Sequence, residues 1–135
     1  MATLIVSVTT DFTALALNDI DVFDFTNSAA EATAAFASAQ FNNIAILQDV
    51  LIDGSAERNH VTVTGGSVNA SLWTFANWFS GFDTITLNGG GGADVITGSI
   101  RDDTVNGGAG ADALDGGLGN DWASYASALG SVKVS

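Results

Sequence analysis

Aspartate recurs at intervals of nine residues in the C-terminal half of the chain, at Asp94, Asp103, Asp112 and Asp121. An apolar residue follows each aspartate two positions later, namely Ile96, Val105, Leu114 and Ala123. Carboxylates are hard oxygen ligands, and Ca²⁺ takes roughly six to eight oxygens from carboxylates and carbonyls together. This spacing of acids therefore indicates a cation site, and the apolar residues indicate short strands whose side chains point inward.

The aspartates belong to nine-residue blocks that run from Gly89 to Ser124. Three of the four blocks fit the pattern Gly-Gly-x-Gly-x-Asp-x-apolar-x in full. Glycine allows a positive φ and has no Cβ, so a loop of this composition can turn its carbonyl oxygens inward. A glycine-rich linker is the alternative interpretation, but a linker does not keep aspartates and apolar residues at fixed offsets.

Nine residues make half a turn if the chain coils as a flattened helix with a sheet on each side. Loops 18 residues apart then stack on one edge, so Asp94 faces Asp112 and Asp103 faces Asp121. Stacked carboxylates repel each other unless a cation lies between them. The pattern thus predicts that the metal is part of the fold.

These blocks resemble the RTX (haemolysin-type) calcium-binding nonapeptide repeat. The resemblance implies Ca²⁺ as a structural cofactor, held between stacked loops by aspartate carboxylates and by carbonyl oxygens of the glycine-rich turns. Carried over to this chain, the first site uses Asp94 and Asp112 with the carbonyls of Gly90, Gly92, Gly107 and Ala109. The second site uses Asp103 and Asp121 with the turn residues Gly116 and Leu118.

One block departs from the pattern, because Ser99 and Arg101 replace its second and third glycines. Each adds a Cβ where a positive φ is expected, and Arg101 adds a cation near the metal. Unit charges ~4 Å apart interact by about 4 kcal/mol at an effective dielectric near 20, and a divalent ion doubles this. We expect Arg101 to swing outward toward Asp102, and we expect the second site to be weaker than the first, or empty. Arg101→Gly should strengthen it, whereas Asp115 lies outside the ligand frame.

The composition limits the partners of this 135-residue chain. A net charge of −12 arises from 15 acidic and three basic residues, and six of the acids lie between Gly89 and Ser124. So negative a chain is a poor ligand for nucleic acid or for an anionic membrane surface. The chain has no cysteine, and no run approaches the ~18 apolar residues of a membrane span.

The rest of the chain reads as short strands with one helix. Strands are expected at 2–8, 19–25, 44–47, 50–52, 61–64, 72–75 and 83–87. A helix is expected from Ala29 to Ala39, because Ser28 and Glu31 form a capping box and alanine favours helix. We therefore predict an all-β, right-handed parallel β-helix/β-roll solenoid with one short capping α-helix.

Three segments are expected within this fold. Residues 1–80 form N-terminal β-helix rungs with the helix near 28–40, residues 81–127 form the calcium-binding roll, and residues 128–135 form a terminal strand. Because the chain stops soon after the last repeat, we expect it to be a fragment of a longer protein. The open end of such a body is expected to continue into further repeats or to associate end to end.

Other chemistry-bearing residues have structural explanations. Asp19 and Asp21 would share one face of a strand, and His60 reads as a residue of a polar turn. The aromatic cluster of residues 73–82 could stack on sugars, but we expect it to be core. The sequence has no His-Glu-x-x-His, Gly-x-Ser-x-Gly or phosphate-loop motif, so we expect no enzyme activity.

Together these features predict a calcium-binding module that folds when Ca²⁺ fills its loops and then presents a rigid acidic surface. The RTX resemblance implies an extracellular or cell-surface protein exported by a type I system that reads a C-terminal signal. The alternative is a carbohydrate-binding, adhesive or carbohydrate-active β-helix domain, which would take a glycan at the aromatic cluster or at Asp19 and Asp21.

Overall fold

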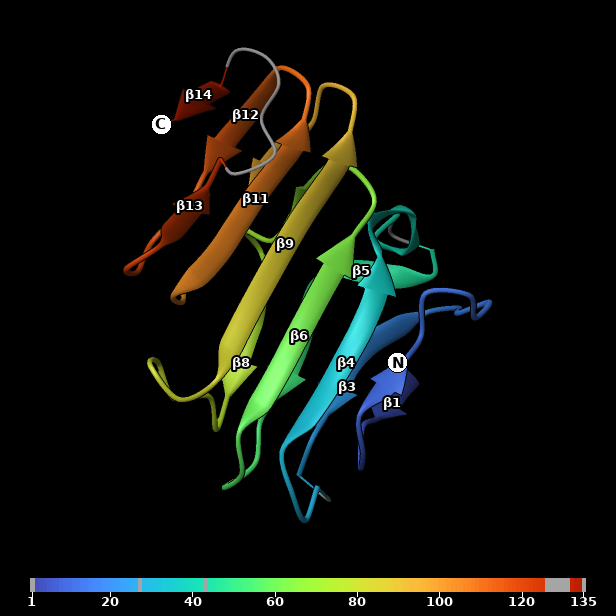
Figure 1. The fold of residues 1–135 in the computed structure, drawn as a ribbon. Coiled ribbons are helices and arrows are strands. Elements are labelled where there is room, and N and C mark those ends of the chain that lie inside the picture. The colour runs from blue at the N-terminus through green and yellow to red at the C-terminus, as the bar shows by residue number, and fades with distance from the viewer. Residues whose placement is uncertain (1, 27, 43, 126–131, 135) are drawn as a thin grey trace.

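The computed structural model describes residues 2–26, 28–42, 44–125 and 132–134 (Figure 1). These residues form an all-β fold in which the strands of three sheets pair in parallel. The only helix among them is a single 3₁₀ turn, η1 (Ser38–Gln40). In this part of the chain, no helix is long and apolar enough to span a membrane.

A six-stranded sheet runs the length of the molecule in the order β13-β11-β9-β6-β4-β2. Its strands are β2 (Thr10–Asp11), β4 (Ala32–Ala37), β6 (Asn59–Thr64), β9 (Thr84–Gly91), β11 (Asp103–Ala109) and β13 (Trp122–Ser124). Behind its N-terminal part lies a sheet of β1 (Ala2–Ile5), β3 (Ile20–Asp24), β5 (Ile46–Asp53) and β8 (Thr74–Ala76). Behind its C-terminal part lies a sheet of β7 (Val68–Asn69), β10 (Val95–Thr97), β12 (Asp112–Asp115) and β14 (Val132–Val134).

The length of each coil shortens toward the C-terminus. Thr33 pairs with His60 and His60 with Thr84, whereas Ile85 pairs with Asp103 only 18 residues later. Val95 likewise pairs with Ala113, which is again 18 residues away. Two nine-residue blocks therefore make one coil, as the sequence predicts, and the parallel strands alternate between two sheets in the manner of a β-roll.

The core follows the inward positions of these strands. The apolar residues Ile96, Val105 and Leu114 are buried and Ala123 is partly buried, which confirms the inward direction predicted for the blocks. In the wider N-terminal coils the space is filled by aromatic rings, including a stacked contact between Phe41 and Trp73 at 5.2 Å. Burial of apolar surface contributes about 25 cal/mol per Å² to folding. This core is therefore the main source of stability of the N-terminal half.

The aromatic cluster divides between core and surface. Trp73 and Trp78 are 1% and 5% exposed, which confirms the prediction that they are core. Their ring faces are covered by protein, so they offer no platform for a sugar. Phe79 and Phe82 are exposed instead, and the guanidinium of Arg58 lies 5.3 Å from the Phe82 ring.

The helix predicted from Ala29 to Ala39 is wrong, because most of this segment is β4. Its burial alternates, with Ala32, Ala34 and Phe36 inside the core. The strand pairs with β6 over six residues, and its small side chains leave room for the stacked rings of Phe23 and Phe36. Strand pairing and ring packing outweigh the helix propensity of alanine here, since propensity is only a weak local preference.

Two smaller expectations are also corrected. His60 lies in β6 rather than in a turn, and its Nε2 is 2.8 Å from a carboxylate oxygen of Glu31. Asp19 has a φ of 56° and precedes β3, so it does not share a strand face with Asp21.

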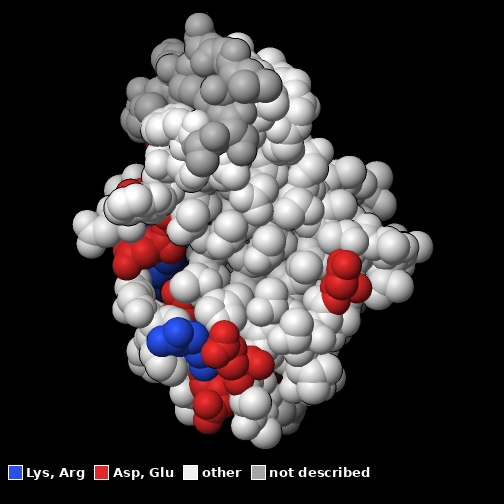
Figure 2. All heavy atoms as spheres, in the orientation of Figure 1, with Lys and Arg blue, Asp and Glu red and all other residues white. Residues whose placement is uncertain are grey.

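Loops connect the sheets along two edges of the molecule. The start edge comprises the loops that precede strands of the six-stranded sheet, at 54–58, 77–83, 98–102 and 116–121. The end edge comprises the loops that follow such strands, at 65–67, 92–94 and 110–111. In Figure 2 the charged side chains of the visible face gather mainly at the left and the bottom, toward the side where strands of the six-stranded sheet begin, and the broad face of the sheet is almost free of charge.

Candidate metal centre

Two stacked aspartates lie at the end edge. The backbone N–H of Asp94 donates to Oδ1 of Asp112 over 3.0 Å, and the N–H of Ala113 donates to the carbonyl of Asp94 over 2.8 Å. Asp94 is 7% and Asp112 is 3% exposed. The other carboxylate oxygen of each residue, Oδ2, is buried and has no hydrogen-bond partner. A buried carboxylate oxygen without a partner is costly, and a cation between the loops would remove that cost.

The first glycine of each block makes room for the aspartate five residues later. A Cβ at Gly89 would lie 2.7 Å from Oδ2 of Asp94, and a Cβ at Gly107 would overlap the carboxylate of Asp112. Gly98 and Gly116 stand in the same relation to Asp103 and Asp121. The carboxylate therefore folds back over the backbone of its own loop, which requires glycine at that position.

Carbonyl oxygens approach the space between the two end-edge loops. A Cβ at Gly108 or Gly110 would overlap the carbonyl oxygen of Gly90 or Gly92, and a Cβ at Gly89 would overlap that of Gly107. The carbonyl of Ala109, also predicted as a ligand, accepts the N–H of Gly92 over 2.8 Å. The residues present thus fit a hard cation, which takes carboxylate and carbonyl oxygens. Among the described residues, no three acidic or histidine side chains form a cluster that could hold a metal by themselves.

The second pair lies at the start edge and differs from the first. The N–H of Asp103 donates to Oδ1 of Asp121 over 3.0 Å, as in the Asp94–Asp112 pair. However, Oδ2 of Asp103 accepts hydrogen bonds from the N–H and the hydroxyl of Ser99, at 2.7 and 3.0 Å. The carboxylate of Asp103 is therefore satisfied by protein donors. This role of Ser99 was not predicted from the sequence, although the spacing Ser-x-x-x-Asp indicates it.

Burial changes the protonation of this second pair. Burial raises the pKa of Asp103 to about 7; the hydrogen bonds from Ser99 oppose the rise, and the charges of Asp121 and Asp102 add to it. Burial also raises the pKa of Asp121, to which the charges of Asp102 and Asp115 contribute. A carboxylate that holds its proton near neutral pH is a poorer cation ligand than an ionised one.

The loop residues at the start edge are placed differently from expectation. Ser99 and Arg101 do not have positive φ, whereas the glycines at the corresponding positions of the other three blocks do. Arg101 does not pair with Asp102: its guanidinium lies 5.5 Å from the Phe75 ring, and Asp102 accepts the N–H of Asn120. The N–H of Leu118 donates to the carbonyl of Ser99, and the carbonyl of Gly116 lies where a Cβ at Gly98 would overlap it.

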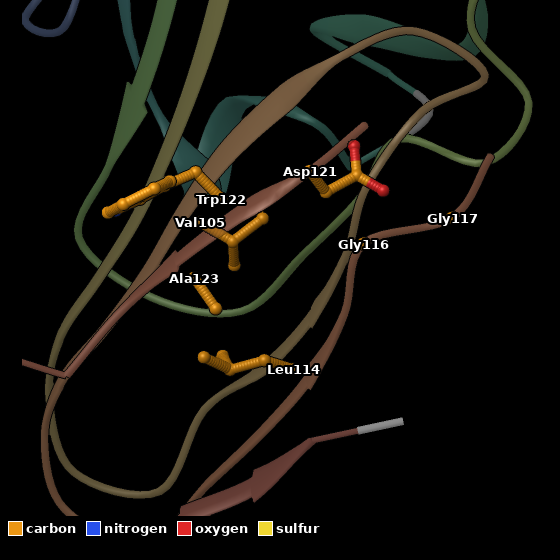
Figure 3. Close-up of a pocket in the computed structure, with 7 residues that line it drawn as sticks. All are labelled: Val105, Leu114, Gly116, Gly117, Asp121, Trp122 and Ala123. Atoms are coloured by element: carbon orange, nitrogen blue, oxygen red, sulfur yellow. The ribbon is translucent and has the colours of Figure 1, made fainter. Parts of the chain in front are cut away.

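A cavity of about 210 Å³ lies beside the last pair of loops (Figure 3). Side chains of the core column, Val105, Leu114 and Ala123, point toward it, and Asp121 and Trp122 border it with Gly116 and Gly117. Trp122 is 72% exposed although it belongs to β13, the last strand of the six-stranded sheet. This end of the roll therefore presents an apolar side chain next to an edge strand.

Comparison with protein families gives one match. Residues 88–123 match the RTX calcium-binding nonapeptide repeat in four copies. The matched residues start one position before the blocks defined above and include all four aspartates, which agrees with the nine-residue register. Comparison of the chain with curated proteins and with solved structures gives no match.

Proposed function

We propose, from the match of residues 88–123 to the RTX calcium-binding nonapeptide repeat, that the protein is a calcium-dependent structural module whose main site is the Asp94–Asp112 pair. Ca²⁺ would lie between the stacked loops at the end edge. The two carboxylates would supply the negative charge, and the carbonyls of Gly90, Gly92 and Gly107 would supply neutral oxygens. The ion would neutralise the two carboxylates, and the glycines would leave between the loops the space that side chains would otherwise fill.

One observation carries this proposal. The Oδ2 atoms of Asp94 and Asp112 are buried without a hydrogen-bond partner, although nearly all buried polar atoms in folded proteins have one. Unpartnered buried acids oppose folding unless a cation compensates them. The Asp103 carboxylate, which has donors from Ser99, lacks this need.

The proposal extends to how the module works in its parent protein. Extracellular calcium modules bind with dissociation constants of about 10⁻⁴ to 10⁻³ M, so the calcium loops of such a module would stay disordered where calcium is scarce and become ordered where it is abundant. We propose export to the cell exterior, with residues 1–80 as N-terminal rungs, 81–127 as the calcium roll of a right-handed parallel solenoid, and 128–135 as its terminal strand. Its acidic body would serve as a rigid surface or spacer.

Calcium titration by calorimetry tests the site. The unaltered chain should bind Ca²⁺, and Asp112→Asn should lower the affinity at least tenfold. Asp115→Asn is the matched control, because Asp115 is exposed and its Oδ1 already accepts the N–H of Gly117. Equal isotherms for the two variants would show that the ion does not use the Asp94–Asp112 pair.

We also propose that the C-terminal end of the roll receives another rung, either from further repeats or from a second copy. The exposed Trp122 on edge strand β13 supports this, because strand edges pair readily with other chains. Sedimentation in calcium should show concentration-dependent association that Trp122→Ser reduces. A monomer at every concentration would count against the second copy as the occupant.

A further inference from the structure

Three of the four nonapeptide turns share one backbone conformation, and the turn of the second block differs from them. In the first, third and fourth blocks the second and fourth positions have φ between 86° and 138°. In the second block these positions are Ser99 and Arg101, and neither has a positive φ. The turn from Gly98 to Asp103 therefore differs from the other three in its backbone φ angles.

Ser99 holds this turn together by hydrogen bonds to two other residues of the turn. Its N–H and hydroxyl both donate to Oδ2 of Asp103, and its Oγ accepts the N–H of Arg101 over 3.0 Å. Its carbonyl accepts the N–H of Leu118 from the next coil. Ser99 is 1% exposed, so these bonds are shielded from water. Together these bonds give protein donors to the Asp103 carboxylate, whereas Oδ2 of Asp94 and of Asp112 has none.

The same turn occurs once more, two coils earlier at the start edge. The segment from Gly54 to Asn59 has serine second and an amide in place of the aspartate, and it also leads into a strand of the six-stranded sheet. The hydroxyl of Ser55 donates to Oδ1 of Asn59 over 2.9 Å, and Ser55 Oγ accepts the N–H of Glu57. The N–H of Asn59 then donates to the carboxylate of Asp83 in the next coil, as the N–H of Asp103 does to Asp121.

The segment at Gly54 has this turn with a neutral side chain, the Asn59 amide, at the position of the aspartate. That side chain requires no charge compensation. A Cβ at Gly54 would overlap the carbonyl oxygen of Asn77 in the next coil, just as a Cβ at Gly98 would overlap that of Gly116. The two turns thus share the bond from the serine hydroxyl to the side chain four residues later and the bond from a later N–H to the serine Oγ. They differ in the carboxylate of Asp103, which also accepts the N–H of Ser99.

We propose that Ser99 takes the place of a calcium ion in the second repeat, so that Ca²⁺ fills the end edge only and the start edge is held by serine turns that form without metal. This proposal rests on the proposed function, since it assigns which of the two edges the ion controls. The two edges of the roll then differ: the start edge is ordered with or without calcium, and the end edge becomes ordered when calcium binds.

Variants at two serines test the proposal by denaturation in excess chelator. Ser99→Ala removes the hydroxyl but keeps the ordinary backbone conformation, so the calcium-free folding equilibrium constant should fall about tenfold. Ser55→Ala is the matched control: it should lower stability equally in chelator and in calcium, and leave the calcium isotherm unchanged. If Ser99→Ala leaves the calcium-free stability unchanged, the proposal is wrong.

The double variant Ser99→Gly with Arg101→Gly restores the repeat pattern in full and tests the consequence for metal. Calorimetry should detect one additional calcium ion per chain, or an affinity at the second site at least tenfold higher. An isotherm equal to that of the unaltered chain overturns this inference but leaves the proposed function standing. An unaltered chain that binds no calcium overturns the proposed function itself.

Hydrogen exchange on the unaltered chain gives a test that depends on no variant. In excess chelator the N–H groups of Ser99 and Arg101 should stay protected, because both have acceptors within the turn. The N–H of Gly92, bonded to Ala109 across the two calcium loops, should lose protection. Simultaneous loss of protection at all three would overturn the proposal.

Discussion

Asp94 donates its backbone N–H to Oδ1 of Asp112, and Oδ1 of Asp94 accepts the hydroxyl of Ser67 over 3.4 Å, so one oxygen of each end-edge carboxylate bonds the loop before it. The second oxygen of each residue remains buried and unpartnered. One carboxylate thus has two roles: Oδ1 fixes the register of the stack, and Oδ2 is left for a cation. This division explains why the repeat needs aspartate at this position and why the fold and the metal site depend on each other.

The two roles can be separated by Asp112→Asn. The amide oxygen can still accept the N–H of Asp94, whereas the charge is lost. A unit charge and a divalent ion ~4 Å apart interact by up to about 8 kcal/mol at an effective dielectric near 20. After screening by solvent, we expect the calcium affinity to fall at least tenfold and the calcium-free stability to stay within about 1 kcal/mol. Chemical denaturation in chelator checks the second expectation, and a large loss there would mean that the charge itself supports the calcium-free fold.

Removing calcium should affect the two halves of the chain unequally. Trp73 and Trp78 lie in the apolar core of the N-terminal coils, which contain none of the proposed metal ligands. Chelation should therefore reduce the β signal in circular dichroism, while the emission of the buried tryptophans keeps its position. Trp122 is already exposed and should shift little. A red shift of the buried tryptophans on chelation would show that the N-terminal coils unfold with the roll.

The repeat region could be predicted from sequence because its spacing has a direct geometric meaning. Nine residues per half coil place Asp94 beside Asp112, and the structure has this pairing. The glycine before each aspartate and the buried apolar residue after it follow from the same pattern. Repetition supplies the long-range contacts, since each loop stacks on a loop with its aspartate at the same position.

The N-terminal half lacks repetition, and there the local pattern was misleading. Ala32 to Ala37 has the composition of a helix, but its conformation is fixed by pairing with β6, a contact that no local rule contains. His60 was assigned to a turn for the same reason, since its flanking residues are polar. The serine turn at Ser99 was missed because it was treated as a defect of the repeat, although the similar segment at Ser55 was present in the sequence.

The calcium-free protein should become less stable as pH rises. The pKa of Asp103 is raised from its ordinary value of 3.8 to about 7 in the folded state. A group that holds its proton more tightly when folded stabilises the fold fully below about pH 4, and this contribution is lost as pH rises to 7. The raised pKa of Asp121 acts in the same direction. Urea denaturation in chelator at pH 5 and pH 8 measures the effect, and Asp103→Asn, which does not titrate, should flatten the dependence.

Two glycines in successive coils offer a steric test of the metal loops. Gly107 and Gly91 both have ordinary φ values, so alanine causes no backbone strain at either. A Cβ at Gly107 would overlap the carboxylate of Asp112, whereas a Cβ at Gly91 meets no atom within 4 Å, and the residue paired with Gly91 is already alanine, Ala109.

We therefore expect Gly107→Ala to destabilise the calcium-bound protein by about 1–3 kcal/mol, the usual cost of overpacking, and to weaken calcium binding by moving Asp112. Gly91→Ala should be neutral or stabilising by about 0.5–1 kcal/mol, because it restricts the unfolded chain. Denaturation with urea in saturating calcium and calorimetric titration measure both effects. Equal stability of the two variants would mean that the carboxylate does not fold back over Gly107, and that the ion is held in a different loop geometry.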